Sequence, residues 1–264
     1  LEFHATRMWE SAQVIHALEF MQKYEMTHLI FHMNELLDVL VLPRKLYSLE
    51  EMWAYWPVRQ DTAIYHREDI KWVVKQCKMR GINFIVQAKE IWVFESLFEM
   101  HPELGLRDAE GHVCPTNPFW PEYMEMRLEE LFTEIPDIDG FTVSLGTRES
   151  KVSLAANRCT CNRCKEAKKH PTEWYKTIIE AMYRPLKKRG KKLIVRDFSY
   201  DVSNLNAIVD ACREVSKDII ISLKTTPHDY YIPFPTNPRI GQTGDATQYI
   251  EYDVWGQFYG MGLF

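Results

Sequence analysis

The feature of this sequence that most constrains its fold is a regular alternation of short apolar runs with amphipathic segments. Seven runs have strand-like character, at 3–8, 28–32, 82–86, 139–143, 193–195, 219–223 and 249–254. Between most of them, apolar residues recur at helical spacing, at 14–21, 70–77, 124–132, 178–186 and 205–215. Nearly continuous apolar strands that alternate with helices predict an α/β fold with a parallel sheet.

Two parallel architectures compete, an open doubly wound sheet and a (β/α)8 TIM barrel. An open nucleotide-binding sheet usually carries a glycine-rich first turn, whereas the first turn here, at 7–11, contains no glycine. Charged residues recur where most strands end, and barrel enzymes build their active sites there. We therefore expect residues 1–264 to form a single TIM-barrel catalytic domain. Seven strands instead of eight, and first residues that resemble the inside of a domain, predict an incomplete barrel that is a fragment of a longer protein.

Composition excludes several classes of protein. Of the 264 residues, 46% are hydrophobic and 13% aromatic, which is too apolar for a disordered chain. A net charge of −5 without a basic stripe argues against nucleic-acid binding. No apolar run approaches a membrane span, and the opening residues 1–4 are not a signal peptide. We expect no membrane partner and slightly favour a cytoplasmic location; the sequence does not predict an oligomeric state.

Acidic and basic residues near successive strand ends suggest a hydrolytic site. Glycoside hydrolysis needs two carboxyl groups, one protonated and one ionised. Glu149 lies in the loop after the fourth expected strand, Asp229 in the loop after the sixth, and Glu251 on the seventh. A single acidic loop residue is more often a solvated charge, but several together favour a site. Arg196 and Lys224 follow buried strands directly, so they would bind an anionic group or form internal salt bridges.

Three further residues complete the expected substrate contacts. Asn34 follows the strand at 28–32, and Asp253 shares one face of the last strand with Glu251 by period two. The indole of Trp255 could stack on the apolar face of a sugar. Four other tryptophans are also expected in loops above the strand ends, where core packing is the competing use: Trp53, Trp56, Trp92 and Trp120.

A cluster of three thiols suggests a metal site. Cys159, Cys161 and Cys164 form a C-x-C-x2-C pattern after the fourth strand. Three thiols within six residues favour a structural zinc ion with a fourth ligand elsewhere. The sequence leaves that ligand open among three residues, Cys114, His112 and His170. Reduced thiols in a loop, or one disulfide, would explain the same pattern without a metal.

Four segments, in the same order, resemble segments of the family 67 α-glucuronidases. Residues 139–143 match the start of "DGFLVK", and 195–200 are similar to "WRAFVY". Residues 223–231 resemble "IKNGPIDFQ", and 251–260 resemble "EFQITQEYLG". The likeness covers mostly residues 139–260; the first 130 residues match only the general style of the wider hexosaminidase-like barrels.

The resemblance implies an inverting hydrolase that cleaves a glycosidic bond to a uronic acid in a polysaccharide or oligosaccharide, with no cofactor required for catalysis. Glu149 would be the general acid, Asp229 a carboxylate on the base side, and Arg196 and Lys224 the ligands of the uronic-acid carboxylate. One lysine and one glutamate of the family pattern are replaced here, by Ser144 and Gln257. Glu251 or Asp253 would then substitute for that glutamate, or Asp229 would act alone.

These departures leave two rival functions open. One is a carbohydrate-binding or catalytically incomplete barrel. The other is a metal-dependent enzyme that uses the cysteine cluster in catalysis.

Overall fold

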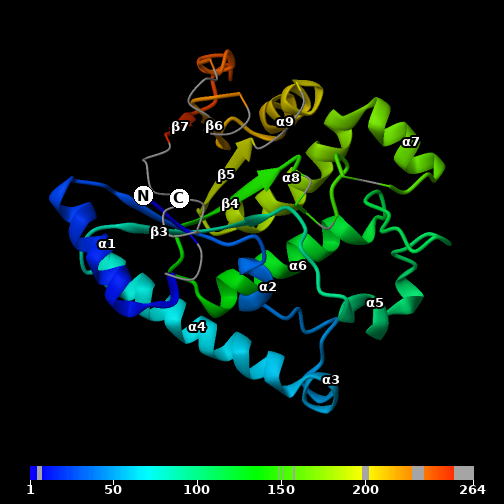
Figure 1. Ribbon diagram of the computed structural model, residues 1–264, viewed down its shortest axis with the longest axis horizontal. Coiled ribbons are helices and arrows are strands. Elements are labelled where there is room, and N and C mark those ends of the chain that lie inside the picture. Colours follow the sequence, from blue (N-terminus) through cyan, green and yellow to red (C-terminus); the bar gives the residue numbers. More distant parts are fainter. Residues whose placement is uncertain are drawn as a thin grey trace, which may run out of the picture.

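The described part of the chain forms one curled parallel sheet. The computed structural model describes residues 1–4, 8–147, 149–150, 152–156, 158–197, 202–227 and 235–252. Within these residues the strands pair in chain order, each parallel to the next (Figure 1). They are β1 (Glu2–His4), β2 (His28–His32), β3 (Asn83–Lys89), β4 (Gly140–Leu145), β5 (Lys192–Asp197), β6 (Ile220–Lys224) and β7 (Gln248–Glu251).

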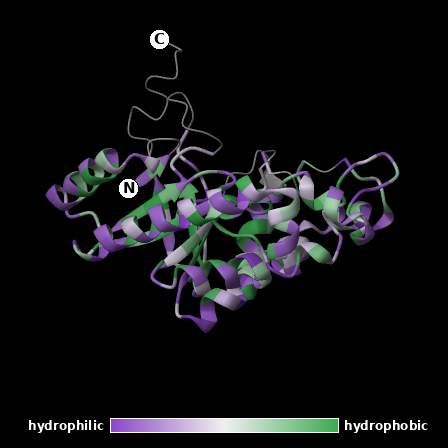
Figure 2. Ribbon diagram, turned by 90° about the horizontal axis from the view of Figure 1, so that it is seen from below, coloured by the Kyte–Doolittle hydropathy of each residue, from purple (hydrophilic) through white to green (hydrophobic). Residues whose placement is uncertain are grey.

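Helices connect the strands and cover the outer face of the sheet (Figure 1). They are α1 (Ser11–Lys23), α2 (Leu36–Leu40), α3 (Leu49–Tyr55), α4 (Pro57–Lys78), α5 (Ser96–Met100), α6 (Phe119–Glu134), α7 (Asn162–Lys169), α8 (Pro171–Lys188) and α9 (Val202–Val215), with a 3-10 turn η2 (Pro102–Leu104). Figure 2 shows predominantly hydrophobic strands between helices that carry many hydrophilic residues. Among the residues described, no helix combines the length and apolar character needed to cross a membrane.

Contacts between distant strands demonstrate the curvature of the sheet. Adjacent strands lie about 4.8 Å apart, so a flat sheet would separate β1 from β5 by roughly 19 Å. Yet Glu2 Oε2 on β1 lies 4.0 Å from Arg196 Nη2 on β5. Near the other end of the strands, Lys192 Nζ on β5 lies 3.4 Å from His28 Nε2 on β2. The sheet therefore curls into a partial barrel, as the sequence predicts.

The two faces of the sheet carry different cores. The outward residues of the strands, such as Phe31, Phe84 and Phe141, pack with the helices in the main hydrophobic core. A separate small cluster lies inside the curl and comprises Ile85, Ile194 and Ile220, with Ile30 and Tyr249 against it. Side chains alternate along a strand, so residues two or four positions from a cluster member on the same strand also point inward. The register between strands extends this assignment to β1 and β4.

Most strands lie where the sequence predicts them, and the main difference is in the connection after β2. The strand expected at 3–8 is β1, which ends at His4, and Met8 lies in a short 3-10 turn. The helix expected over 14–21 is α1, but the sequence analysis assigned no helix between the strand at 28–32 and residue 70, where α2, α3 and the first half of α4 lie. The start signals of α3 and α4 are local: Ser48 and Glu51 form a capping box, and Pro57 is the first residue of α4.

A buried ion pair fixes the chain just beyond β3. Arg127 Nη1 of α6 donates to Asp38 Oδ2 of α2 at 2.7 Å, and both side chains are at most 1% exposed. The Tyr123 hydroxyl donates to the other Asp38 oxygen at 3.2 Å. The same guanidinium donates to the backbone carbonyls of Glu90 and Trp92, each at 3.1 Å. One arginine therefore joins two helices to the end of a central strand.

Replacing Arg127 with methionine leaves the Asp38 carboxylate buried without a counter-charge, so we expect the free energy of unfolding to fall by about 3–5 kcal/mol. Arg184 of α8 is a matched control, because it pairs with Glu125 of α6 while 55% of its side chain is exposed. Arg184→Met should cost less than about 1 kcal/mol. Urea denaturation measures both, and equal losses would contradict a special role for the buried pair.

Candidate active site and metal centre

Charged and polar side chains gather inside the curl at the C-terminal ends of the strands. The register sets Lys89 beside Ser144, and Ser144 beside Arg196. It continues from Arg196 to Ser222, and it sets Lys224 beside Glu251. All of these side chains point into the curl. Five of them lie two or four residues after a member of the inner cluster of Ile85, Ile194, Ile220 and Tyr249, and Ser144 is in register with one of those five. We call this set the barrel mouth; it comprises Lys89, Ser144, Arg196, Ser222, Lys224 and Glu251.

The predicted residues Arg196 and Glu251 are in direct contact in the barrel mouth. Arg196 Nε donates to Glu251 Oε2 at 2.6 Å, and Ser222 Oγ donates to Glu251 Oε1 at 2.7 Å. Arg196 is only 4% exposed. Since each carboxylate oxygen accepts a hydrogen bond from a different strand, Glu251 is held in a defined orientation across β5, β6 and β7.

Glu149 forms a second ion pair, with a residue that the sequence analysis did not select as a site residue. Its Oε2 lies 2.7 Å from Lys89 Nζ, at the end of β3. Lys89 is 2% exposed and Glu149 is 48% exposed at the side chain. Burial lowers the pKa of Lys89, and the contact with Glu149 opposes this shift. The carboxylate is therefore available to a ligand while a buried ammonium fixes one of its oxygens.

The remaining predicted residues divide into two groups. Asn34 follows β2, and its carbonyl accepts from the Lys89 backbone N–H at 3.1 Å, so it borders the barrel mouth. Lys224 is 2% exposed at the end of β6. The other three predicted residues lie outside the described part of the chain: Asp229, Asp253 and Trp255.

The structure adds a carboxylate–imidazole pair that sequence reasoning missed. His32 Nδ1 on β2 lies 2.7 Å from Glu2 Oε1 on β1. Although burial opposes it, the bond to His32, followed by the charge of Arg196, lowers the pKa of Glu2 to about 2. Burial lowers the pKa of His32. Period two from Ile30 marks His32 as inward, but the sequence carries no signal that pairs it with Glu2.

Glu90 is a second addition, and its environment is unlike that of the ion-paired carboxylates. It is fully buried next to Lys89, and within the described residues neither oxygen makes a hydrogen bond of normal geometry. Burial raises the pKa of Glu90 to about 7, while weaker contacts with its own backbone, Ser153 and Lys89 oppose the shift. The side chain lies beneath the loop that carries Glu149, as its proximity to Ser153 indicates.

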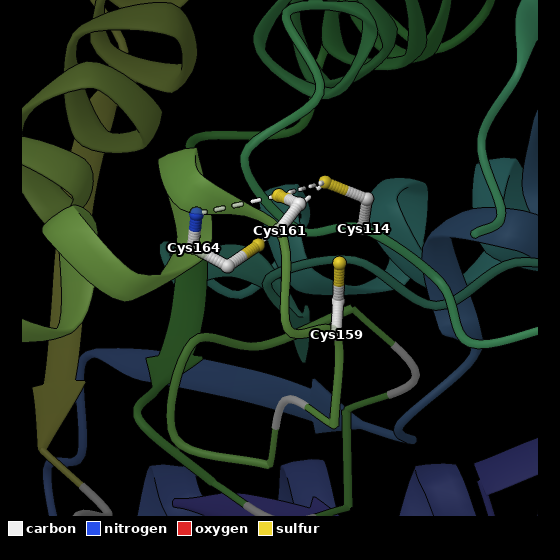
Figure 3. A group of neighbouring side chains, drawn as sticks. All are labelled: Cys114, Cys159, Cys161 and Cys164. Atoms are coloured by element: carbon white, nitrogen blue, oxygen red, sulfur yellow. Dashed lines mark hydrogen bonds between the residues drawn. The ribbon is translucent and has the colours of Figure 1, made fainter. Parts of the chain in front are cut away.

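Four thiols converge beside this loop (Figure 3). The sulfur atoms of Cys114, Cys159, Cys161 and Cys164 all lie within 4.8 Å of one another. Cys114 Sγ is 3.8 Å from Cys161 Sγ and 3.6 Å from Cys164 Sγ. Zinc–thiolate bonds of about 2.3 Å in a tetrahedron require sulfur–sulfur edges of about 3.8 Å. The donor set and its spacing therefore fit a four-thiolate zinc site.

Local structure explains how the thiols are presented. Cys161 is the N-cap of α7, and the Cys164 backbone N–H donates to its Sγ at 3.5 Å. That bond lowers the pKa of Cys161 to about 6, whereas burial raises the pKa of Cys159 to about 12. A thiol at a helix N-terminus is readily deprotonated, as metal ligation requires.

The fourth thiol comes from the connection between β3 and β4. Of the three ligands that the sequence left open, Cys114 joins the group in the described residues, and neither histidine does. The indole N–H of Trp120 donates to the Cys114 carbonyl at 2.8 Å, and Trp174 donates to the Pro115 carbonyl at 3.0 Å. The sequence placed Trp120 in a loop above the strand ends, but it is a buried residue of α6. Its indole instead holds the segment that carries Cys114.

Comparisons with known proteins support the fold. No protein-family model matches the sequence, and no curated protein matches it. Among solved structures, the chain is similar to a GH138 enzyme targeting pectin rhamnogalacturonan II, at 20% identity and a TM-score of 0.56 over 85% of this chain and 24% of the other.

Two further solved structures have the same kind of fold. A GH20 module of the pneumococcal exo-β-D-N-acetylglucosaminidase StrH matches at 11% identity and a TM-score of 0.53, over 94% of this chain and 64% of the other. The β-galactosidase of Rahnella sp. R3 matches at 11% identity and a TM-score of 0.51, over 97% and 50%. The chain thus spans less than two thirds of each, and the likeness is one of fold, that of an incomplete (β/α)8 barrel.

The buried Glu90 carboxyl predicts a pH-dependent stability. Its pKa is 4.5 without the protein environment and about 7 in the fold. Between these values the unfolded chain has lost the proton that the folded chain keeps, so stability should fall as pH rises through this window. Above pH 7 the total loss should level off at about 3 kcal/mol. Urea denaturation from pH 4.5 to 8 measures this slope.

Two variants isolate the Glu90 contribution. Glu90→Gln and Glu90→Met both remove the titrating group but leave different side chains in the same space. Both should lose the same pH-dependent part of the wild-type curve, whatever their absolute stabilities. Curves that run parallel to the wild type would show that Glu90 does not titrate in this range.

Proposed function

We propose that this chain is the barrel part of a glycoside hydrolase. The observation that carries the proposal is the pair of ion-paired carboxylates, Glu149 with Lys89 and Glu251 with Arg196, at the C-terminal ends of parallel strands. Active sites of TIM-barrel enzymes are built at this end of the strands. Most glycoside hydrolases use two carboxyl groups, one on each side of the glycosidic bond that is cleaved.

The proposed roles of Glu149 and Glu251 follow from their positions, and that of Asp229 from the resemblance to the family 67 α-glucuronidases. Glu149 is nearly half exposed, so it can take up a proton from solvent and reach a glycosidic oxygen. In that protonated form it would donate the proton to the oxygen as the bond to the anomeric carbon breaks, which returns Glu149 to the carboxylate. Asp229, with Glu251, would accept a proton from the water whose oxygen attacks the anomeric carbon. The products are a sugar hemiacetal and a free hydroxyl on the leaving group. An inverting reaction needs carboxyl groups about 6.5–9.5 Å apart.

We further propose a uronic acid as the sugar. The barrel mouth contains three cationic side chains, Lys89, Arg196 and Lys224, each at most 4% exposed. Cations at buried positions favour an anionic ligand, and arginine matches a carboxylate with two donors. The resemblance of residues 139–260 to the family 67 α-glucuronidases supports the same substrate class. Pectin, named for the similar GH138 enzyme, is one polysaccharide to test.

Glu149→Gln should lower turnover of an uronide substrate by about 100- to 10,000-fold, because the leaving oxygen loses its proton donor. Hydrolysis of 4-nitrophenyl glucuronides and galacturonides, beside neutral glycosides, gives the baseline. A 2,4-dinitrophenyl leaving group needs less protonation, so the loss should be much smaller on that substrate. Glu125→Gln, which alters the surface ion pair with Arg184, should leave turnover unchanged.

Unchanged turnover in Glu149→Gln would assign the proton donor elsewhere. Binding of sugars without turnover of any glycoside would support the rival function, a carbohydrate-binding barrel. Faster hydrolysis of neutral glycosides than of uronides would contradict the proposed substrate class.

We also propose that the four cysteines hold a structural zinc ion. Four thiolates fill a tetrahedral zinc site and leave no open position for substrate or water, which is typical of structural sites. This argues against the rival in which the cysteine cluster is catalytic. The zinc would link the connection that carries Cys114 to the loop that carries Glu149.

Elemental analysis of the purified protein should find one zinc per chain, and Cys164→Ser should lose the metal and lower the melting temperature. Cys212→Ala is the matched control, because Cys212 is an equally buried thiol outside the cluster; this variant should keep its zinc. A stoichiometric redox metal with visible absorption, or a Cys164→Ser variant that retains zinc and stability, would contradict a structural zinc site.

A further inference from the structure

Below the barrel mouth lies a second, uncharged set of inward side chains. Thr142 on β4 is in register with Gln87 on β3, and Gln87 is in register with His32 on β2. On the other side, Thr142 is in register with Ile194, a member of the inner isoleucine cluster. Residues in register across parallel strands share a face, so the three polar side chains point into the curl. We call His32, Gln87 and Thr142 the polar floor.

The polar floor is buried but incompletely hydrogen-bonded. Its residues are 6%, 1% and 2% exposed. Within the described part of the chain, His32 Nε2 and Thr142 Oγ1 have no hydrogen-bond partner. The Gln87 amide reaches Ser144 Oγ at 3.5 Å, the outer limit of a hydrogen bond. Buried polar atoms are nearly always paired, so two unpaired atoms and one long hydrogen bond at neighbouring positions need an explanation.

The Glu2 contact determines what His32 can offer. Its Nδ1 lies 2.7 Å from the Glu2 carboxylate, and Glu2 remains ionised because its pKa is lowered to about 2. We therefore assign the shared hydrogen to Nδ1, which leaves Nε2 as a lone-pair acceptor. A fixed acceptor, an amide that both donates and accepts, and a hydroxyl stand side by side. This is the complement of neighbouring hydroxyl groups on a sugar ring.

We propose that His32, Gln87 and Thr142 bind hydroxyl groups of the substrate sugar. The carboxylate or the anomeric carbon of the same sugar would lie in the barrel mouth. The proposal rests on the proposed function and names the residues that discriminate between sugar configurations. Two residues along a strand correspond to about 6.6 Å, which is the step from Gln87 to Lys89 and close to the width of a pyranose ring. The charged mouth would bind one edge of the sugar and the polar floor the other.

Thr142→Val tests the proposal, because valine keeps the shape and removes the hydroxyl. If the hydroxyl serves a ligand, the ligand-free variant should be as stable as the wild type or more so, since an unpaired buried hydroxyl is costly. The same variant should lose at least about tenfold in sugar affinity, as sites built to hydrogen-bond a hydroxyl are sensitive to such losses. Gln87→Met provides a second variant of similar shape, and it should show the same loss of affinity.

The measurements are thermal denaturation and calorimetric titration with D-glucuronate, D-galacturonate, D-glucose and D-galactose. Thr177→Val is the control, because the Thr177 hydroxyl bonds the Glu173 carbonyl within α8, away from the sheet interior. It should leave the affinity unchanged. Affinity lost in both floor variants and kept in the control supports the proposal.

Three results would overturn it: wild-type affinity in both floor variants, a Thr142→Val variant that is clearly less stable without sugar, or no binding of any of the four sugars by the wild type. The proposed hydrolysis is judged separately, by turnover of aryl glycosides and by Glu149→Gln. Turnover with unaffected floor variants therefore rejects the polar floor alone. Binding that depends on the floor, without turnover, rejects the hydrolase alone.

Discussion

The buried contact between Asp38 and Arg127 is the interaction on which the rest of the candidate site depends. It fixes the chain where β3 ends, because the same guanidinium binds the carbonyls of Glu90 and Trp92. The backbone at Lys89 is therefore held in place, so that its side chain points toward Glu149, and the Glu90 side chain stays buried. The helix that supplies Arg127 also supplies Trp120, whose indole binds the Cys114 carbonyl. One helix, α6, thus supports both the ion pair of Lys89 with Glu149 and the cysteine cluster.

Much of the fold could be predicted from the sequence because its cause is local. Alternating apolar runs fix strands and helices, charges directly after such runs identified Arg196 and Lys224, and Glu251 was identified as an acidic residue on the last strand. The pairings could not be predicted in the same way. Lys89 meets Glu149, and Glu2 meets His32, only because neighbouring strands pair in the sheet and bring together segments that are far apart in the sequence. Cys114 joins the other thiols for the same reason. Trp120 was misjudged because it lies in the first turn of α6, and its indole is buried against a backbone carbonyl six residues earlier in the chain.

The inside of the curl is layered along the strands. Near their beginnings, His28 contacts Asn83 and Lys192. The isoleucine cluster follows, in register with part of the polar floor, and the charged mouth comes last. Charged side chains are costly to bury without partners, and those of the barrel mouth lie where they can meet one another and a ligand. The isoleucine cluster closes the curl toward the N-terminal ends of the strands. The layers would let one site recognise both the charge and the hydroxyl pattern of a sugar.

The position of Cys114 has a consequence for how the chain acquires its native structure. This cysteine precedes Cys161 by 47 positions and Cys164 by 50, with all of α6 and β4 between them. In the proposed zinc site, the peptide that carries the other three thiols could bind the ion first, but the fourth bond requires two successive strand–helix units to have packed together. The fourth zinc–sulfur bond would therefore form only in chains that have packed these units correctly. A chain whose third and fourth strands were misaligned would be left with an open, reactive and removable metal ion.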